Sequence, residues 1–380
     1  MKDRINILFI IDHFHLAGGT EKHLSYLVRH LDRTKFKCMI VVFDFGHNPL
    51  SNKIEASGVP IVHIPVYRYY TLNALIKGLE LFRLIKKNNI DLVQTFHIKS
   101  DFYGALIAKL SGVKCIVSSK RDTGDLKSRW HFFLNRRVKN LFSGFIAVAD
   151  AVKDQIVVTE HIKREKITTI HNGVNLGKFA VPDEEKRMQI RRKFGYSESD
   201  FIIGTVAWFR PEKCYDVFFE AIDLVRQSAG NVKAVVVGGG QQLDYYKNKI
   251  NNTALSDHVL FTGLVDNVSE YINLFDVACL VPGKNEGFSN SILEKMAMGL
   301  PLVVTDVGGN SESVLDGFNG FVIPPGDSSA LSQSILELYR DPEKRRLMGK
   351  RSRQRVEEHF TIFKMIKDHE KYYESFFNSC

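Results

Sequence analysis

The chain has 380 residues, of which 44% are hydrophobic and 25% charged, as expected for a globular protein with two domains. Its formal net charge of +9 indicates an acidic partner such as a nucleotide-sugar or an anionic membrane surface. No nucleic-acid-binding motif is recognisable, so nucleic acid is the least favoured partner. No apolar run is long enough for a membrane helix, and the five scattered cysteines argue against disulfides or zinc and for a reducing cytosol.

The first half of the chain alternates short apolar runs with helical patterns. Ile5–Ile11 is apolar and is not followed by a small-residue cleavage site, so it is expected to be a strand rather than a signal peptide. Further strands are expected at 38–43, 59–64, 91–97, 145–149 and 167–170, and a helix at 75–87. This alternation predicts an α/β fold with helices on both faces of a parallel sheet.

Polar residues follow several of these strands. Gly18 and Gly19 form a turn after the first strand, where glycine allows the backbone to approach a phosphate. His97 ends the strand at 91–97, and ligands bind at the carboxyl ends of strands in open α/β sheets. Arg121 and Asp122 follow the next strand and are candidate acceptor contacts. Taken singly, a glycine pair or a lone histidine is more often structural.

The segment from Lys127 to Lys139 is basic and aromatic. Such a segment is typical of a helix that lies on an anionic membrane surface. The equally weighted alternative is an ordinary amphipathic helix whose Phe132, Phe133 and Leu134 face the core.

A second α/β domain is expected after a charged linker. Residues 179–200 are polar and contain a short helix at 184–194. Strands are then expected at 201–208, 232–237, 259–264, 278–281, 302–305 and 320–323, with helices beginning at 328 and 342. We therefore predict a first domain at 1–178, a second at 179–361, and a terminal helix within 362–380.

The stretch 285–306 is predicted to be a loop, a short helix and a buried strand. Gly287 makes the loop flexible, and Ser289 and Asn290 are suitable N-cap residues. A helix beginning there points its backbone N–H groups and its dipole at an anion.

Two carboxylates flank this helix start. Glu286 lies on the loop and Glu294 about one turn into the helix. Ionised carboxylates only accept hydrogen bonds, so they suit the hydroxyls of a ribose or a sugar beside a phosphate. The alternative is that Ser291 and Glu294 form a capping box and Glu286 is a solvated charge.

The whole stretch resembles the donor-binding signature of retaining GT-B glycosyltransferases of family 4. That signature has two glutamates separated by seven residues, here Glu286 and Glu294, then a Gly-x-Pro turn, here Gly299–Pro301. A Gly-Gly-x-x-Glu motif follows, as at Gly308–Glu312. The resemblance covers nearly the whole chain and implies the GT-B fold, two Rossmann-like domains that face an interdomain cleft. It also implies that the terminal helix crosses back onto the first, acceptor-binding domain.

The resemblance implies a role for each candidate residue. Lys213 corresponds to a family lysine that neutralises the donor diphosphate. Trp208 stands where the family has an arginine, and Arg210 is the candidate substitute. The catalytic candidates are His97, Glu286 and Lys213, with Glu286 on the donor sugar. The implied donor-binding set is Gly18, Gly19, Arg210, Lys213, Leu264, Glu286, Gly287, Phe288, Ser289, Asn290 and Glu294, with Leu264 near the base and Glu294 on ribose.

The implied reaction is transfer of a sugar, with retention, from a UDP- or GDP-sugar to a saccharide or lipid-linked acceptor. Surface polysaccharide or glycolipid synthesis is the expected context, in the cytoplasm or on the inner face of the cell membrane. The sequence has no Asp-x-Asp motif, so neither a metal nor another cofactor is expected. A sugar-nucleotide 2-epimerase or hydrolase and a non-catalytic nucleotide-sugar-binding protein remain the alternatives.

Overall fold

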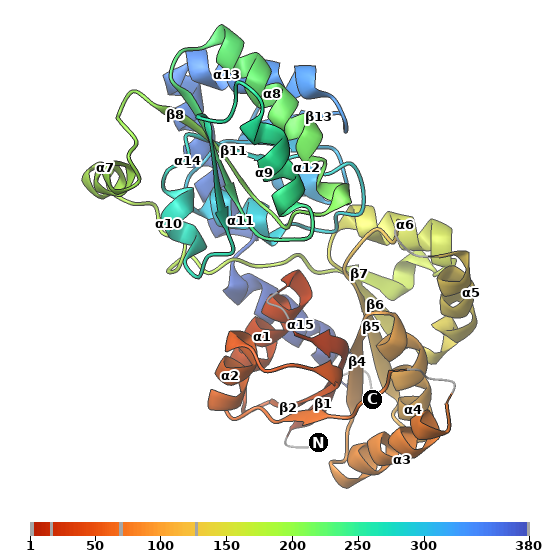
Figure 1. Cartoon of the computed structure of the whole chain (residues 1–380). Coiled ribbons are helices and arrows are strands. Elements are labelled where there is room, and N and C mark those ends of the chain that lie inside the picture. The colour runs from red at the N-terminus through yellow and green to blue at the C-terminus, as the bar shows by residue number, and fades with distance from the viewer. Residues whose placement is uncertain (1–3, 16–17, 68–70, 126–127, 378–380) are drawn as a thin grey trace. The chain divides into compact units, whose positions relative to one another are not determined.

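The computed structural model describes residues 4–15, 18–67, 71–125 and 128–377, and it divides into two compact units (Figure 1). Unit 1 contains Met1–Asn172 and Ile362–Cys380, and unit 2 contains Gly173–Thr361. The sequence analysis placed the corresponding boundary after residue 178. Each unit is a Rossmann-like fold around one parallel sheet, which confirms the predicted fold class.

Unit 1 is built on a seven-stranded sheet with the order β3-β2-β1-β4-β5-β6-β7. All neighbouring strands are parallel. The strands are β1 (Ile5–Phe14), β2 (Phe36–Phe45), β3 (Ile61–His63), β4 (Leu92–Phe96), β5 (Cys115–Lys120), β6 (Gly144–Ala147) and β7 (Ile167–Thr169). The order reverses between β1 and β4, which makes this pair the switch point where ligands bind in such sheets.

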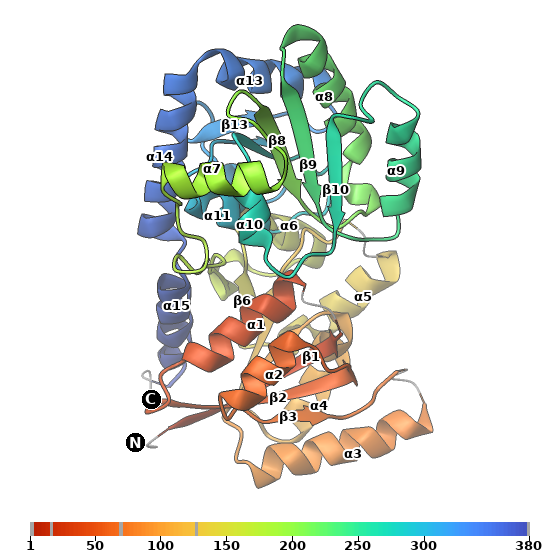
Figure 2. The ribbon, with the colours of Figure 1, turned by 60° about the vertical axis from the view of Figure 1, so that its left-hand side comes forward.

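Helices cover both faces of this sheet (Figures 1 and 2). One face carries α1 (Gly19–His30), α2 (Pro49–Ala56) and α15 (Ile362–Ser375). The other carries α3 (Leu72–Lys87), the π-helical turn η1 (Ser100–Gly104), α4 (Ala105–Leu110), α5 (Arg129–Val138), η2 (Lys139–Leu141), α6 (Asp150–Glu160) and η3 (Arg164–Lys166). Right-handed crossovers produce this division, because the chain changes direction along the sheet between β3 and β4.

The C-terminal helix α15 is an integral part of unit 1. Tyr373 is fully buried, and its hydroxyl donates to the Gln94 side chain of β4 at 2.6 Å. Met365 and Ile366 join the same core as Leu24 of α1. A segment nearly 280 residues away in sequence therefore closes one face of the sheet.

Unit 2 has a six-stranded parallel sheet with the order β10-β9-β8-β11-β12-β13 and its switch point between β8 and β11. The strands are β8 (Phe201–Val206), β9 (Val232–Val237), β10 (Val259–Gly263), β11 (Val277–Leu280), β12 (Leu302–Thr305) and β13 (Gly320–Ile323). The helices are α7 (Glu184–Lys193), η4 (Pro211–Lys213), α8 (Tyr215–Ser228), α9 (Leu243–Asn251), α10 (Val268–Ile272), α11 (Asn290–Ala297), α12 (Asn310–Ser313), α13 (Ser328–Arg340) and α14 (Pro342–His359).

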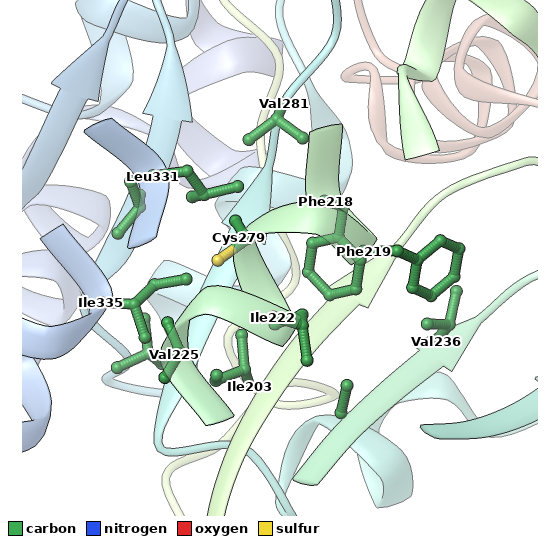
Figure 3. Close-up of a cluster of buried hydrophobic side chains, with 14 of the residues drawn as sticks. Ile203, Phe218, Phe219, Ile222, Val225, Val236, Cys279, Val281, Leu331 and Ile335 are labelled. Atoms are coloured by element: carbon green, nitrogen blue, oxygen red, sulfur yellow. The ribbon is translucent and has the colours of Figure 1, made fainter. Parts of the chain in front are cut away.

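The core of unit 2 lies between its sheet and helices α8 and α13 (Figure 3). Phe218 and Ile222 of α8 pack with Leu331 and Ile335 of α13 over Cys279 of β11. All five side chains are at most 1% exposed. This packing fixes the ends of β8 and β11, from which the site residues of unit 2 extend.

Candidate functional site

The loops after β8 and β11 meet at the switch point of unit 2. Lys213, in the turn after β8, donates through Nζ to Oε2 of Glu286, in the loop after β11, at 2.5 Å. Their side chains are only 18% and 12% exposed. The residues predicted to hold the donor diphosphate and the donor sugar are therefore brought together as a nearly buried ion pair.

Glycine backbone packing holds the Glu286 loop in place. Gly308 has φ of +57°, and a Cβ there would lie 1.9 Å from the Glu286 carbonyl oxygen. The Gly309 N–H donates to the Gly287 carbonyl at 2.6 Å. Gly283 donates from its backbone to the Glu212 carbonyl at 2.9 Å, which ties the loop to the turn that carries Lys213. The two glycines of the Gly-Gly-x-x-Glu motif are therefore explained by their close packing against the backbone of the Glu286 loop.

Helix α11 begins at the predicted place, and its start excludes a capping box between Ser291 and Glu294. Its N-cap is Ser289, not Ser291. The Ser291 hydroxyl donates to the Val206 carbonyl at the end of β8, at 2.6 Å, and so anchors the helix start to the sheet. Glu294 lies in the second turn of α11 and is 8% exposed.

A residue that the sequence analysis missed lies next to these carboxylates. Lys295 is fully buried, and its Nζ donates to the Cys279 carbonyl at 3.2 Å. Burial lowers the pKa of Lys295 to about 8, and the nearby charges of Glu294 and Glu286 oppose this shift. The signal was present in the sequence, because Lys295 stands three residues after Ile292 on the apolar side of the helix.

The other predicted donor-side residues take different positions. Arg210 is exposed and lies over the Trp208 ring, with 5.9 Å from its guanidinium carbon to the ring centroid. Leu264 follows β10 and is 68% exposed. Phe288 is buried and packs against Phe360, so its side chain belongs to the core and only its backbone can serve a ligand.

The switch point of unit 1 carries histidines. His13 near the end of β1 stacks on His97 after β4, with ring centroids 4.7 Å apart and planes 18° apart. His97 has φ of +79°, a left-handed conformation that is costly for a residue with a Cβ. Strain of this kind is concentrated at functional sites. His13 also lies near the carboxyl end of a strand at the switch point, as His97 does, but it was not predicted from the sequence.

Glu21 holds this histidine pair from the first turn of α1. Its Oε1 lies 3.2 Å from Nδ1 of His13, and its side chain is 6% exposed. The hydrogen bond to Glu21 raises the pKa of His13 above its ordinary value, although partial burial opposes this. A Cβ on Gly18 would lie 2.4 Å from Glu21 Oε2, so Gly18 leaves the space that this carboxylate occupies. Gly19 is the first residue of α1.

Arg121 and Asp122 lie directly after β5, the strand next to β4. Arg121 donates to the side-chain oxygen of Asn172. Burial lowers the pKa of Arg121 to about 10, and the charges of Glu21 and Asp122 oppose this shift. Arg121 therefore lies within electrostatic range of the carboxylate that holds His13.

Neither a metal-binding cluster nor a membrane-spanning helix is found among the residues that the structure describes. Residues 4–15, 18–67, 71–125 and 128–377 contain no group of three or more His, Cys, Asp or Glu side chains placed to hold a metal ion. Within these same ranges, no helix is both long enough and apolar enough to cross a bilayer.

Two family models match the chain. Residues 186–355 match the glycosyl transferases group 1 model, and residues 17–178 match the glycosyltransferase family 4 model. Together these matches take in most of both units.

Relatives and solved structures agree with these matches. The N-acetyl-alpha-D-glucosaminyl L-malate synthase of Bacillus anthracis is 30% identical over 60% of this chain, and the match spans 59% of that protein, less than two thirds of its length. The UDP-Gal:alpha-D-GlcNAc-diphosphoundecaprenol alpha-1,3-galactosyltransferase of Escherichia coli is 26% identical over 83% of each chain. The structure of Anabaena Alr3699/HepE in complex with UDP has a TM-score of 0.86 at 21% identity, and covers 98% of this chain and 100% of its own.

Proposed function

The chain belongs to the GT-B glycosyltransferases of the family 4 kind, and on this premise we propose that it transfers a sugar with retention from a UDP- or GDP-sugar. The acceptor is a hydroxyl on a saccharide or on a lipid-linked precursor, in polysaccharide or glycolipid synthesis. The observation that carries the proposal is the Lys213–Glu286 ion pair, which lies with Glu294 around the start of α11.

The ion pair suggests how a donor is received. A diphosphate at the start of α11 takes over Lys213, because its negative charge competes with the Glu286 carboxylate. Glu286 is then free to accept hydrogen bonds from hydroxyls of the transferred sugar, and Glu294 accepts those of the ribose. Charge develops on the diphosphate as the glycosidic bond breaks, so these fixed donors stabilise the transition state more than the ground state.

Unit 1 is proposed to supply the acceptor side. His97 contacts the transferred sugar or the reacting face, and His13 and Glu21 fix its position. Arg121 and Asp122 are proposed acceptor contacts. Lys213, the start of α11 and, as a candidate, Arg210 neutralise the diphosphate, and the proposed reaction needs no metal ion. Relatives support the donor class: the HepE structure was also solved in complex with UDP-glucose, with a TM-score of 0.82 to this chain.

The first experiment measures the melting temperature against a panel of nucleotides and nucleotide-sugars in the presence of a chelator. A ligand at about 100 times its Kd stabilises the fold by roughly 2.7 kcal/mol, which such a measurement detects. Glu294→Gln is expected to weaken donor binding by about 1.5–3 kcal/mol, because a charged acceptor becomes neutral. Glu343→Gln is the matched control, because Glu343 is 81% exposed and pairs with surface Arg346.

The outcomes separate the proposed transferase from its alternatives. Stabilisation by one nucleotide-sugar, with an acceptor-dependent product of retained anomeric configuration by NMR, supports the transferase. An acceptor-independent epimer or free sugar identifies the epimerase or hydrolase. Binding without any product identifies the binding protein, and no binding at all overturns the proposal.

A further inference from the structure

Helix α3 exposes a continuous apolar stripe. Leu72, Leu75, Ile76 and Leu79 are 75%, 71%, 61% and 49% exposed. Their spacing of three, four and seven residues places them on one side of the helix. The buried positions of the helix are different residues, namely Ala74, Gly78, Leu81 and Ile85. The stripe therefore faces away from the core of unit 1, and Figures 1 and 2 both show α3 at the outer margin of that unit.

The neighbouring helix, which packs on α3, exposes apolar side chains as well. The Tyr103 hydroxyl in η1 donates to the Ala74 carbonyl of α3, which locks the two segments together. In α4, Leu106 and Leu110 are 40% and 65% exposed. We refer to Leu72, Leu75, Ile76, Leu79, Leu106 and Leu110 as the α3–α4 surface.

The opposite face of unit 1 differs. Among the described residues, no large hydrophobic side chain of α1 or α2 is exposed, and α15 exposes only Phe363. Single exposed apolar residues are ordinary, but several on one side of a helix, with more on the helix packed beside it, indicate an interaction surface.

Positive charge is concentrated in the same part of the chain. Residues 72–110, which contain α3 and α4, have six Lys and Arg but only three Asp and Glu. Arg83, Lys86 and Lys87 are exposed in the second half of α3, after the apolar stripe. Lys109 is exposed between Leu106 and Leu110. The partner must therefore combine an apolar layer with negative charge.

We propose that the α3–α4 surface docks the protein on an anionic lipid bilayer. The apolar side chains enter the boundary between headgroups and acyl chains, and the basic side chains bind the anionic headgroups. A nucleic acid would match the charge but leave the leucines in water, whereas a bilayer satisfies both. The biological role of this docking rests on the proposed function, since it would bring the transferase to a membrane. Its test does not, because vesicle binding is measured without donor or acceptor.

A membrane contact was considered from the sequence on another segment, the one that forms α5, with equal weight given to an ordinary amphipathic helix. In α5, Leu134 and Val138 are buried, as the alternative of an ordinary amphipathic helix requires. Phe133 does not face the core as that alternative expected, because it is 43% exposed and stacks on Trp130. Lys127 lies outside the described residues. The α3–α4 surface has six exposed large apolar side chains, whereas the described part of α5 has Trp130 and Phe133, and the α3–α4 surface was not predicted from the sequence.

The experiment is flotation of the full chain with vesicles of phosphatidylglycerol and phosphatidylcholine, compared with phosphatidylcholine alone. We expect binding to the anionic vesicles that weakens as salt rises. The paired change Leu75→Ser with Ile76→Ser is expected to lower the partition coefficient about tenfold or more. Lys86→Ser with Lys87→Ser is expected to lower it about thirtyfold on anionic vesicles.

Phe363→Ser is the matched control, because Phe363 is 71% exposed but lies on α15 of the opposite face. It should leave vesicle binding unchanged, and the melting temperatures of all variants should confirm that they are folded. Failure to bind anionic vesicles overturns the docking proposal, even where the donor still binds. So does binding that the α3 variants leave intact. A concentration-dependent dimer that Leu75→Ser with Ile76→Ser abolishes would assign the surface to a second copy instead.

Discussion

The two units use the same topological position for different chemistry. In unit 2 the residues after β8 and β11 form a nearly buried ion pair, Lys213 with Glu286, inside loops packed backbone to backbone at glycines. In unit 1 the residues at β1 and β4 form a pair of stacked histidines, His13 and His97, and His13 is half exposed.

The difference indicates what each unit must tolerate. In unit 2 an anionic group can compete with Glu286 for Lys213. Such a site suits a ligand whose charged part does not vary, as in the proposed nucleotide diphosphate. The site of unit 1 is more open, its charge depends on pH through His13, and its unit carries the exposed α3–α4 surface. Substitutions can test the close packing of unit 2 and the electrostatics of each site separately.

Gly308→Ala is expected to have the largest effect. The new methyl group would lie 1.9 Å from the Glu286 carbonyl oxygen, so the Glu286 loop must move. We expect donor affinity to fall at least about a hundredfold and stability to fall by roughly 2–4 kcal/mol. Isothermal titration with the donor and urea unfolding measure the two effects.

Gly317→Ala is the control for this change. Gly317 also has a positive φ, +69°, but no described residue other than its two chain neighbours has an atom within 4 Å of an added Cβ. It should therefore show only the backbone strain of about 1 kcal/mol, with normal donor affinity. Equal losses in both variants would mean that the strain, and not the packing on Glu286, is responsible.

The ion pair of unit 2 can be tested by removing one partner and then both. Lys213→Met leaves the Glu286 carboxylate without its cation at 12% exposure, so we expect a loss of about 2 kcal/mol of stability. Lys213→Met combined with Glu286→Gln should recover most of that stability but not donor binding. Urea unfolding and donor titration separate the two results.

Lys249→Met is the matched control for the pair. Lys249 bonds Asp216 at 2.6 Å, but both side chains are about half exposed. Water screens such a pair, so its loss should cost about 0.5 kcal/mol or less. Normal donor affinity in the Lys213→Met variant would contradict its proposed role on the diphosphate.

The sequence predicted the fold and the principal charged residues of unit 2, because both depend on local patterns. Apolar runs predict the strands, and the stretch that contains Glu286 and Glu294 resembles the family's donor-binding signature. The sequence did not predict that Lys213 and Glu286 pair with each other or that Ser291 bonds the Val206 carbonyl. Such contacts join segments as much as 85 residues apart, and no local pattern encodes them.

The α3–α4 surface was missed for a related physical reason. Helix α3 has apolar residues on two sides, at Leu72 and Ile76 as well as at Leu81 and Ile85. Periodicity finds an apolar helix but does not indicate which apolar side the sheet covers. Lys295 was missed for the opposite reason. A lysine is expected to be exposed, and this one is buried.

Lys295→Met tests that buried charge. A base with a lowered pKa is destabilised by folding while it is charged, so the cost is complete below about pH 8 and disappears between pH 8 and 10.5. The variant should therefore be more stable by about 2 kcal/mol at pH 7, and the gain should fade near pH 10. Urea unfolding at both pH values measures it, with exposed Lys350→Met as the control. A destabilised variant at pH 7 would show that the charge is compensated.

Glu21→Gln tests the smallest expected effect, on the histidine pair of unit 1. The hydrogen bond to Glu21 is the main cause of the raised pKa of His13, so the variant should return that pKa toward 6.5. A raised histidine pKa stabilises the fold most fully below pH 6.5, and this contribution is lost as pH rises through the folded-state pKa. The variant should therefore lose stability in mild acid more than at pH 8. NMR titration of the histidine ring carbons measures the shift.

Asp44→Asn provides the comparison for that titration. Asp44 bonds the neighbouring His15 at 2.9 Å, and its charge contributes least among the causes that raise the pKa of His13. Its removal should move the His13 titration much less than Glu21→Gln does. If the two variants shift the pKa of His13 equally, that pKa is set by all the charges near the end of β1 together. Glu21 then does not fix the ring that stacks on His97. If only Glu21→Gln moves it, the carboxylate at the start of α1 controls the histidine pair directly, and unit 1 then has a fixed polar contact comparable to the ion pair of unit 2.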